Sequence, residues 1–488
     1  MASPHDRDPV DAWLNEEVEP LAPRPGTFER IRHRARQRKA AKAVMSGAGI
    51  MIVVAAAVIV PRISSTLFQS HNVALHRLAA GPSSSPRPAP ASRANESLNA
   101  RSSTALPSQR TSSLGIPGNR VPRNFQPTSV TFVSLRTGAV IGQAGTPGQC
   151  GPPNPADCTS LAGTSDYGTS WYGVSAPVTG APDGSHGVGQ LRFLNARDGW
   201  AFGPELWVTH DGGAHWTQEQ TYGMRVTDLE TAGDRAFAIF ATCTGTGPSY
   251  AADCTRLSLY SSPADSDKWL PVPLLNASPA FYVHLGPGSE PESASLVLSD
   301  GTGYMLDPSG KLFSGPLTGD FWAEASLPVV SRHGQCLPGA PGPSGKPTGA
   351  LLAASANELV LVCTSGTSPA GDTQIKEIVA STDGGARWSA IGTAPAAGIA
   401  TSVAIQAQDN LVLLATDSGL YRSSDGGRSW QLAQPSPRSA AAAAPGFSYV
   451  GMTSPAQGVA LPADAGLHEV FITTDGGSSW RPRLVSRP

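Results

Sequence analysis

The sequence has few charged residues and lacks the motifs of the common catalytic and cofactor sites. Only 15% of its residues are Asp, Glu, Lys or Arg. It has no Cys-x-x-Cys pair and no histidines at metal-ligand spacing, which argues against a metal site. It also lacks a Gly-x-Ser-x-Gly nucleophile motif and a phosphate-binding glycine loop. We therefore expect no cofactor and no metal.

Glycine and proline are abundant instead, with 53 and 44 residues in a chain of 488, which is typical of a turn-rich β protein. The net charge of −2 hides an asymmetry along the chain. Residues 128–488 carry 18 basic and 29 acidic side chains, a net charge of −11. An acidic surface of this kind argues against nucleic acid as a partner.

The N-terminal quarter predicts a membrane anchor. Ala43 to Val60 is an uncharged run of 18 residues, just long enough to cross a bilayer as a helix. The basic residues before it place residues 1–42 in the cytoplasm by the positive-inside rule. We expect a tail (1–42), a single transmembrane signal anchor (43–61) and a Ser/Pro/Arg-rich stalk (62–127). A cleaved signal peptide is the alternative; a lipoprotein anchor is excluded because no cysteine lies nearby.

An eight-residue pattern recurs five times in the rest of the chain. Ser or Thr comes first, Asp two residues later, Gly four later and Trp seven later. We call each copy a box. The aspartates and tryptophans of the boxes, which we expect to be structural, are Asp166, Asp211, Asp383, Asp425 and Asp475, with Trp171, Trp216, Trp388, Trp430 and Trp480.

The box has the chemistry of a hairpin turn, because its glycines reach positive φ and its Asp and Ser/Thr oxygens can accept hydrogen bonds from turn amides. It resembles the Asp-box, or sialidase-type (BNR), repeat. In that family the box caps the hairpin between the outer strands of a β-propeller blade. The chain is also similar to photosystem stability-factor-like propellers and to bacterial BNR-repeat membrane proteins. The family includes hydrolases and binding proteins, so the resemblance implies a fold rather than an activity.

The spacing of the boxes predicts an all-β fold, a β-propeller of about seven blades over residues 128–488, with six or eight as alternatives. Each unit is about 51 residues long, near the size of a four-stranded blade. The third unit, Val226 to Val272, has a decayed box with Ala264 at the Asp position, and the fourth, Phe281 to Pro316, has none. To close the ring, Thr128 to Leu135 should pair with the last blade near Val470 to Leu484.

Six cysteines all fall in the propeller region. Fifteen pairings are possible, but bonds between sequence neighbours within one blade are the simplest. An extracytoplasmic location makes such bonds plausible. The expected disulfides are Cys150–Cys158, Cys243–Cys254 and Cys336–Cys363.

Two kinds of function remain open. A sialidase-type glycoside hydrolase would need three arginines around a carboxylate, a Tyr–Glu pair and an Asp acid. Arg192, Arg225 and Arg332 lie near expected inner strands. Another glycosidase that uses paired acids is a further option, because Glu219, Asp228 and Glu230 cluster between the second and third units, although we interpret them as loop acids.

The favoured hypothesis is a non-catalytic scaffold outside the cell membrane that binds an envelope ligand or protein. Its binding residues cannot be named from the sequence. The long loops are the first place to search, at Ser175–Gly187, Leu317–Gly349 and Gln434–Gly446, with the loop-side residues His284, Phe321, Trp322 and His333. Converging Arg, Glu and Tyr side chains in the central funnel would instead favour an enzyme.

Overall fold

The computed structural model describes residues 120–487 except for 145–157, 184, 245–253, 276–281, 287–290, 319, 326, 328–339, 342–346, 349, 368–372 and 438–444. The expected tail, anchor and most of the stalk lie outside the described residues. Among the residues that are described, no helix is long and apolar enough to cross a membrane.

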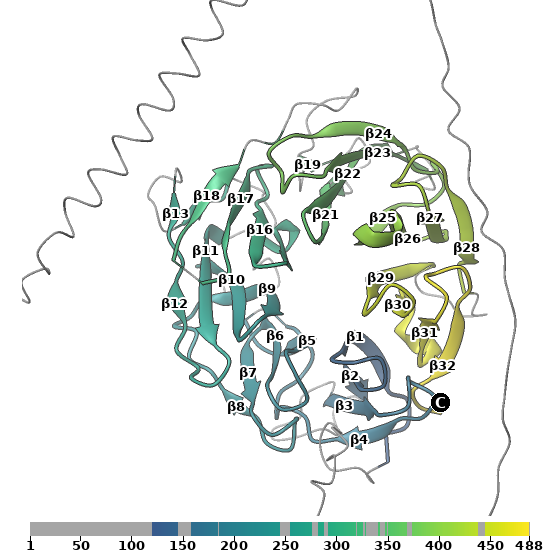
Figure 1. The fold of residues 1–488 in the computed structure, drawn as a ribbon. Coiled ribbons are helices and arrows are strands. Elements are labelled where there is room, and N and C mark those ends of the chain that lie inside the picture. The colour runs from purple at the N-terminus through teal and green to yellow at the C-terminus, as the bar shows by residue number, and fades with distance from the viewer. Residues whose placement is uncertain are drawn as a thin grey trace, which may run out of the picture. The chain divides into compact units, whose positions relative to one another are not determined.

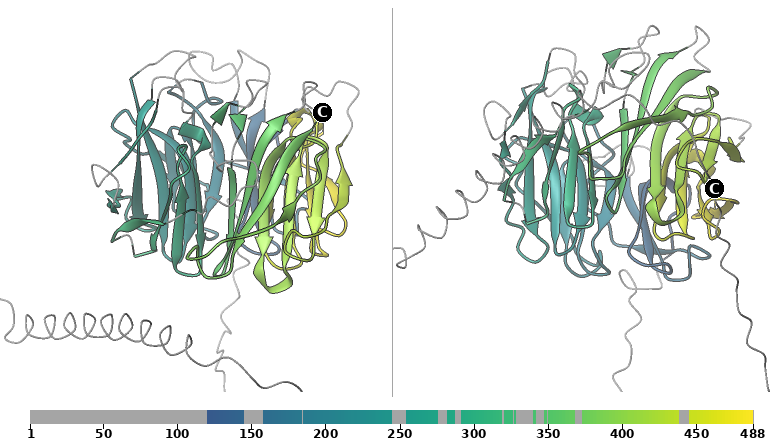
Figure 2. Two further views of the ribbon diagram at one scale, coloured as in Figure 1. Left: turned by 90° about the horizontal axis from the view of Figure 1, so that it is seen from above. Right: turned by 45° about the horizontal axis from the view of Figure 1, so that its top comes forward.

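Seven antiparallel sheets stand around a common axis like the blades of a propeller (Figure 1). Each blade is built from consecutive strands, and its first strand lies nearest the axis. The strands run roughly along the axis in the side views (Figure 2). The prediction of an all-β, seven-bladed β-propeller is therefore confirmed.

The first three blades contain β1 (Gln126–Phe132), β2 (Gly138–Ala144), β3 (Cys158–Thr164) and β4 (Tyr172–Val174); β5 (Val188–Phe193), β6 (Gly199–Pro204), β7 (Leu206–Thr209) and β8 (Thr217–Gln218); and β9 (Arg225–Ala232), β10 (Arg235–Cys243), β11 (Cys254–Pro263) and β12 (Leu270–Pro271). The fourth contains β15 (Ser295–Ser299), β16 (Thr302–Leu306), β17 (Leu312–Pro316) and β18 (Trp322–Ala325).

The last three blades contain β21 (Ala350–Ser355), β22 (Glu358–Thr367), β23 (Gln374–Ser381) and β24 (Ser389–Thr393); β25 (Ala400–Gln406), β26 (Leu411–Thr416), β27 (Gly419–Ser423) and β28 (Gln431–Pro435); and β29 (Phe447–Met452), β30 (Gly458–Pro462), β31 (Glu469–Thr473) and β32 (Arg481–Leu484). Short 3₁₀ turns are η2 (Pro291–Ser293), η3 (Ala407–Asp409) and η4 (Ala465–Leu467).

Blade 4 departs most from the expected pattern. It extends to β18, so the expected end at Pro316 is wrong and Trp322 belongs to this blade. The chain entering it adds β13 (Leu274–Leu275), which pairs in parallel with β18, and β14 (Val283–His284), which pairs with β11 of blade 3. After β18, β19 (Ala340–Pro341) and β20 (Pro347–Thr348) form a separate hairpin. These additions account for the long stretch between the boxes of blades 2 and 5.

The ring closes by packing rather than by strand pairing. The expected pairing of the first segment with the last is wrong, because β1 pairs with β2 inside its own blade. Each blade completes its own sheet from consecutive sequence, so no strand is left over to complete another. Instead, the Asn124 amide donates to the Arg487 carbonyl at 3.2 Å. The Phe125 amide donates to Ser486 Oγ at 3.1 Å, and Gln457 Nε2 to the Leu135 carbonyl at 2.7 Å.

The buried apolar side chains form seven clusters, one at each interface between neighbouring blades. At the closing interface, Val130 and Val140 of blade 1 pack with Val459 and Val470 of blade 7. Because every sheet has two buried faces, each strand shows long apolar runs such as Leu411–Thr416, which is buried throughout. The core is thus distributed around the ring.

The five boxes connect the third and fourth strands of blades 1, 2, 5, 6 and 7, and each makes the same hydrogen bonds. In blade 7, Thr473 Oγ1 donates to Asp475 Oδ1 at 2.8 Å and accepts from the Gly477 amide at 2.9 Å. Asp475 Oδ1 also accepts from the Ser479 amide at 2.9 Å. The equivalent bonds recur in the other four boxes.

Each box also touches two other parts of the ring. The residue after its Asp donates to a carbonyl in the turn between the first two strands of its own blade, as Gly476 does to Ala456 at 2.8 Å. Its Trp packs in the cluster shared with the preceding blade: Trp216 with blade 1 and Trp480 with blade 6, for example. The box tryptophans thus lie between blades.

Blades 3 and 4 have other contacts where the box is missing. Trp269 keeps its position and packs against the cluster between blades 2 and 3. His210 of the blade 2 box places Nδ1 2.9 Å from Asp198 and Nε2 3.0 Å from Asp267 in the blade 3 turn. Burial lowers the pKa of His210, but these two carboxylates outweigh it and raise the pKa above its usual value. In blade 4, Trp322 of β18 is fully buried between blades 3 and 4.

The two faces of the ring differ. The boxes and the turns between first and second strands share one face, which we call the box face. The connections between blades lie on the other face, the loop face. Cys158 begins β3, and Cys243 and Cys254 flank the connection between β10 and β11, so these cysteines lie at the loop face.

Cys243–Cys254 is a disulfide, as predicted. Cys158 and Cys363 are also disulfide-bonded. Cys150 and Cys336 lie outside the described residues, so the pairings that involve them stay predictions.

The contact between box and preceding blade can be tested with a matched pair of glycines. Gly426 and Gly427 both have positive φ, at 71° and 93°. A Cβ at Gly427 would come within 2.8 Å of Cγ2 of Ile378 in blade 5, whereas at Gly426 it would meet only the end of Arg428, at 3.5 Å. Gly426→Ala should therefore cost about 1 kcal/mol of backbone strain. Gly427→Ala should cost about 1–3 kcal/mol more from overpacking. Equal losses of unfolding free energy in the two variants, measured by urea denaturation, would contradict the contact between the box and the preceding blade.

Because the box aspartates are structural, we expect them to make the free energy of unfolding depend on pH in acid. Burial raises the pKa of Asp475, but hydrogen bonds from Ser479 and Thr473 outweigh it and lower the pKa below its ordinary value of 3.8. Because the folded pKa is the lower one, the stabilisation is complete above about pH 4 and is lost as pH falls through the folded pKa. Asp475→Asn should lower the free energy of unfolding by about 1–2 kcal/mol at pH 7.

The cost should be smaller at pH 3 than at pH 7, because the wild-type carboxyl begins to take up a proton as pH falls toward its folded pKa. Denaturation curves at the two pH values measure it, with the exposed turn residue Asp300→Asn as control. Unchanged stability at pH 7 together with lost ligand binding would mean that Asp475 is functional instead.

Candidate functional site

The first strands of the blades surround a central channel that contains two adjoining cavities, of about 360 and 320 Å³. The smaller touches β5, β9, β15, β21, β25 and β29, and the larger touches β1, β5, β9, β29 and β30. Three polar side chains line both cavities, namely Arg192, Glu230 and Tyr449. Inner strands have one residue in two facing the channel, so these positions follow from strand alternation.

Arg192 of β5 and Glu230 of β9 form an ion pair inside the channel. Arg192 Nε donates to Glu230 Oε1 at 2.8 Å, and their side chains are 15% and 29% exposed. Arg192 Nη1 donates to the carbonyl of Leu191 at 2.9 Å and lies 3.5 Å from Ser129 Oγ of β1. Burial lowers the pKa of Arg192, but Glu230 outweighs it and raises the pKa above its usual value. The pair joins blades 2 and 3.

Asp228 lies two residues before Glu230 on β9, so both carboxylates belong to the same side of the strand. Its Oδ1 accepts from the Leu229 amide at 2.9 Å, and its Oδ2 from the Leu296 amide of β15 at 2.8 Å. Burial first, and then the charge of Glu230, raise the pKa of Asp228 to about 7, against the opposing effect of Arg192. Two carboxylates therefore share one guanidinium, and the more buried one binds a proton readily near neutral pH.

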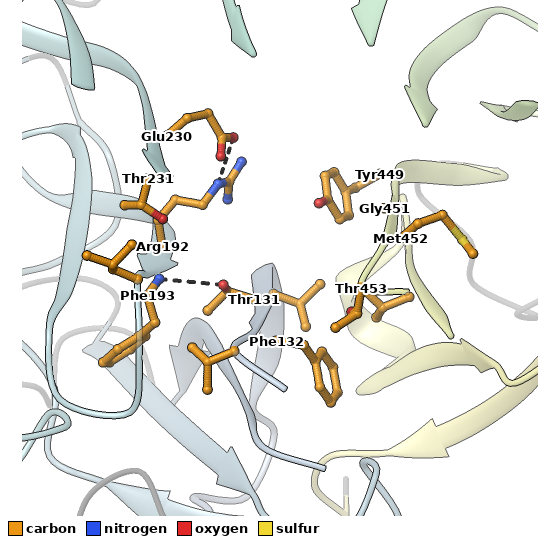
Figure 3. A pocket seen from close by; sticks show the side chains of 14 residues that line it. Thr131, Phe132, Arg192, Phe193, Glu230, Thr231, Tyr449, Gly451, Met452 and Thr453 are labelled. Atoms are coloured by element: carbon orange, nitrogen blue, oxygen red, sulfur yellow. Dashed lines mark hydrogen bonds and ion pairs between the residues drawn. The ribbon is translucent and has the colours of Figure 1, made fainter. Parts of the chain in front are cut away.

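Tyr449 of β29 faces this cluster from the other side of the cavity (Figure 3). Burial raises the pKa of its phenol. Gly451, two residues further along β29, leaves space for the ring, because a Cβ there would collide with the Tyr449 hydroxyl. The opening between Tyr449 and the Arg192–Glu230 pair is thus bounded by groups from three blades.

The rest of the channel wall combines apolar side chains with small hydroxyl side chains. Val297 of β15, Leu351 of β21 and Val403 of β25 line the smaller cavity together with the charged residues. Ser295 Oγ is buried at this cavity and has no hydrogen-bond partner among the described residues. The charged side chains of the smaller cavity therefore come from blades 2 and 3, and blades 4 to 6 contribute apolar side chains together with Ser295, Thr401 and Ser402.

Some sequence-based candidates meet at this site and others do not. Asp228 and Glu230 are inner-strand residues, so their interpretation as solvated loop acids is wrong. Glu219 lies elsewhere, beside a cavity of about 230 Å³ with His186 and Glu205. The pKa of Glu219 is raised by burial and then by Asp267.

The three candidate arginines do not form a described clamp. Arg225 pairs with Glu292 at 2.9 Å and lines neither channel cavity. Arg332 and His333 lie outside the described residues. Trp322 is a core residue and not a loop-side aromatic, whereas Phe321 is 49% exposed and His284 is exposed at the end of β14.

The sequence does not predict Tyr449 as a site residue, because nothing near it in the sequence marks a site. A usable signal was its position. It is the third residue of the first strand of its unit, and Asp228 and Arg192 are the fourth and fifth residues of theirs. Aligning the units by their first strands would have brought these polar residues to one level of the channel.

The sequence matches no protein-family model and no curated protein. Among solved structures, YCF48 bound to D1 peptide is similar at 16% identity and a TM-score of 0.40, covering 77% of this chain and 99% of that one. YCF48 from Cyanidioschyzon merolae is similar at 13% identity and a TM-score of 0.37, covering 61% and 85%. The GH74 xyloglucanase from Xanthomonas campestris has 12% identity and a TM-score of 0.26, covering 74% and 73%. Likenesses this low indicate no function.

The buried carboxyl of Asp228 predicts a stability change near neutral pH. Its folded pKa, about 7, is above its ordinary value of 3.8. The folded state therefore holds a proton that the unfolded state has released, so stability falls as pH rises from about 4 to 7. Asp228→Asn should remove this slope, making the variant less pH-dependent than wild type between pH 5 and 8 by about 1–3 kcal/mol.

Chemical denaturation at pH 5, 6.5 and 8 measures the slope. His210 contributes to both proteins equally, so the difference isolates Asp228. The exposed Asp300→Asn serves as the matched control and should leave the slope unchanged. Identical slopes in wild type and Asp228→Asn would show that Asp228 is ionised throughout.

Proposed function

We propose that this protein is a membrane-anchored, extracytoplasmic β-propeller that binds a ligand or protein of the cell envelope in its central channel without catalysing a reaction. The observation that carries the proposal is the cluster of Arg192, Glu230 and Asp228 opposite the apolar side chains of blades 4 to 6. Burying charged groups costs free energy that apolar packing would avoid. A channel needed only to hold the blades together could be lined by small or apolar side chains.

The non-catalytic role is supported by how the carboxylates are held. Glu230 Oε1 is engaged by Arg192, and each oxygen of Asp228 accepts a backbone amide. A sialidase-type site would require three arginines around one carboxylate, and in the described part of the chain a single arginine lines the channel cavities. The arrangement suits selective binding better than group transfer.

The location rests on the sequence and the cysteines. The uncharged run from Ala43 to Val60 and the basic residues before it support an anchor with the propeller outside. The disulfide-bonded state of the described cysteines supports an oxidising location. We further propose that the five boxes are members of the Asp-box class, because all five make the same hydrogen bonds.

A glycoside hydrolase of the sialidase type is the second candidate. One observation favours it, since Arg192, Glu230 and Tyr449 line the same cavity. An enzyme would use Glu230 and Tyr449 as the reacting groups and the protonated Asp228 as an acid.

One assay separates the two. The full-length protein is screened on an array of glycans, envelope polymers and peptides, and in parallel against fluorogenic glycosides. We expect binding without turnover, weakened at least tenfold by Glu230→Gln and unaffected by Glu324→Gln on the outer strand β18. Turnover that disappears in Glu230→Gln would establish the hydrolase. Binding equally strong in both variants would place the ligand outside the channel.

A further inference from the structure

When Asp228 and Glu230 are both ionised, the channel cluster carries two negative charges against the one positive charge of Arg192. Asp228 and Glu230 lie on the same side of β9, and Arg192 is the one cation that lines the described part of both cavities. Arg192 engages Oε1 of Glu230 through Nε. Among the described residues, Oε2 of Glu230 accepts no hydrogen bond, so one carboxylate oxygen at the cavity is free to accept a donor.

The groups around that oxygen restrict what can approach it. Val297, Leu351 and Val403 provide apolar side chains to the same cavity, beside the hydroxyl side chains of Ser295, Thr401 and Ser402. Tyr449 presents an aromatic ring across the opening (Figure 3). A ligand there must combine a hydrogen-bond donor with a hydrocarbon part, and aromatic faces attract alkylammonium cations.

We propose that the channel binds an alkylammonium group, carried by a free amine or by a lysine side chain, with its nitrogen at Glu230 and Asp228 and its alkyl chain against Leu351 and Val403. This inference rests on the proposed function and specifies the ligand class of the same site. An ammonium group supplies three donors and no acceptor, which matches a site of acceptor oxygens. It also supplies the positive charge that the two carboxylates lack.

Other ligand classes fit less well. An anion would face two carboxylates and an arginine whose Nε is already engaged by Glu230. A neutral polyol would leave the charge unbalanced and would present hydroxyls to the apolar side chains. The net charge of −11 over residues 128–488 also raises the local concentration of cations over anions.

Binding should release a proton. Asp228 holds a proton near neutral pH because Glu230 is close and the site is buried. An ammonium beside both carboxylates stabilises the charged form of Asp228, so the proton leaves as the cation enters. The affinity for amines should therefore rise as pH increases from 6 to 8, whereas an uncharged ligand should show no such trend.

The test is titration calorimetry of the full-length protein with hexylamine, with hexan-1-ol as the uncharged counterpart and with the peptide acetyl-Gly-Lys-Gly-amide. Hexylamine should bind at least tenfold more tightly than hexan-1-ol. Repeating the titration in phosphate and in MES, two buffers that contain no primary amine and differ in ionisation enthalpy, should reveal proton release at pH 6.5. Asp228→Asn should bind the amine without releasing a proton, and Glu230→Gln should bind at least tenfold more weakly. Glu324→Gln should behave as wild type.

A second variant keeps the test informative if Glu230→Gln does not fold. Leu351→Trp fills the space beside the apolar side chains without touching the charged cluster, and it should also weaken hexylamine binding at least tenfold. Circular dichroism melts confirm that each variant is folded. Binding of hexylamine but not of the lysine peptide identifies a free amine as the source of the group, and binding of both identifies a lysine-bearing polypeptide as well.

The outcomes separate this inference from the proposed function. Equal binding of hexylamine and hexan-1-ol, or hexylamine binding unaffected by Glu230→Gln and Leu351→Trp, overturns the alkylammonium site. If a neutral or anionic array ligand is instead lost in Glu230→Gln, the binding function stands and only the ligand class is wrong. If no ligand of any class responds to Glu230→Gln, both are wrong.

Discussion

The contact between each box and the preceding blade is the constraint on which the rest of the ring depends. A four-stranded sheet with two apolar faces cannot remain exposed, so each blade is stable only against its neighbours. The box meets this need with its tryptophan and its second glycine. Trp430 and Gly427 of blade 6 reach the sheet of blade 5, and Trp480 and Gly477 of blade 7 reach blade 6. The turn that ends one hairpin therefore also sets the position of the next blade.

A ring fixed in this way can hold charged side chains where isolated strands could not. The Arg192–Glu230 pair links blades 2 and 3, and the bond from the Leu296 amide to Asp228 links blades 3 and 4. Blades 3 and 4 are also the two without an intact box. The same polar groups thus connect the blades where the contact between a box and the preceding blade is missing. They also face the channel in which we propose that a ligand binds. Stability and the proposed binding would therefore depend on the same residues.

The sequence predicted the fold well because the box is a local pattern with a local cause. Asp475, Gly477 and Trp480 follow one another closely, so their turn geometry can be inferred without knowing what they touch. The exceptions depend on distant contacts. Trp322 replaces a box tryptophan from another strand position, and the ring closes through Phe125 and Ser486, which are far apart in the sequence.

The site was harder to predict for the same reason. Arg192, Asp228 and Glu230 were noticed, but their charges suggested solvent exposure, and only the arrangement of three first strands shows that they meet Tyr449. The central claim is that ligands enter the channel, and methyl NMR of the full-length protein during titration with an envelope extract tests it most directly. The account predicts shifts of the Leu351 and Val403 methyl signals and none at Leu432, which is 51% exposed on the outer strand β28. Shifts confined to surface methyls such as those of Leu432, with Leu351 and Val403 unchanged, would contradict it.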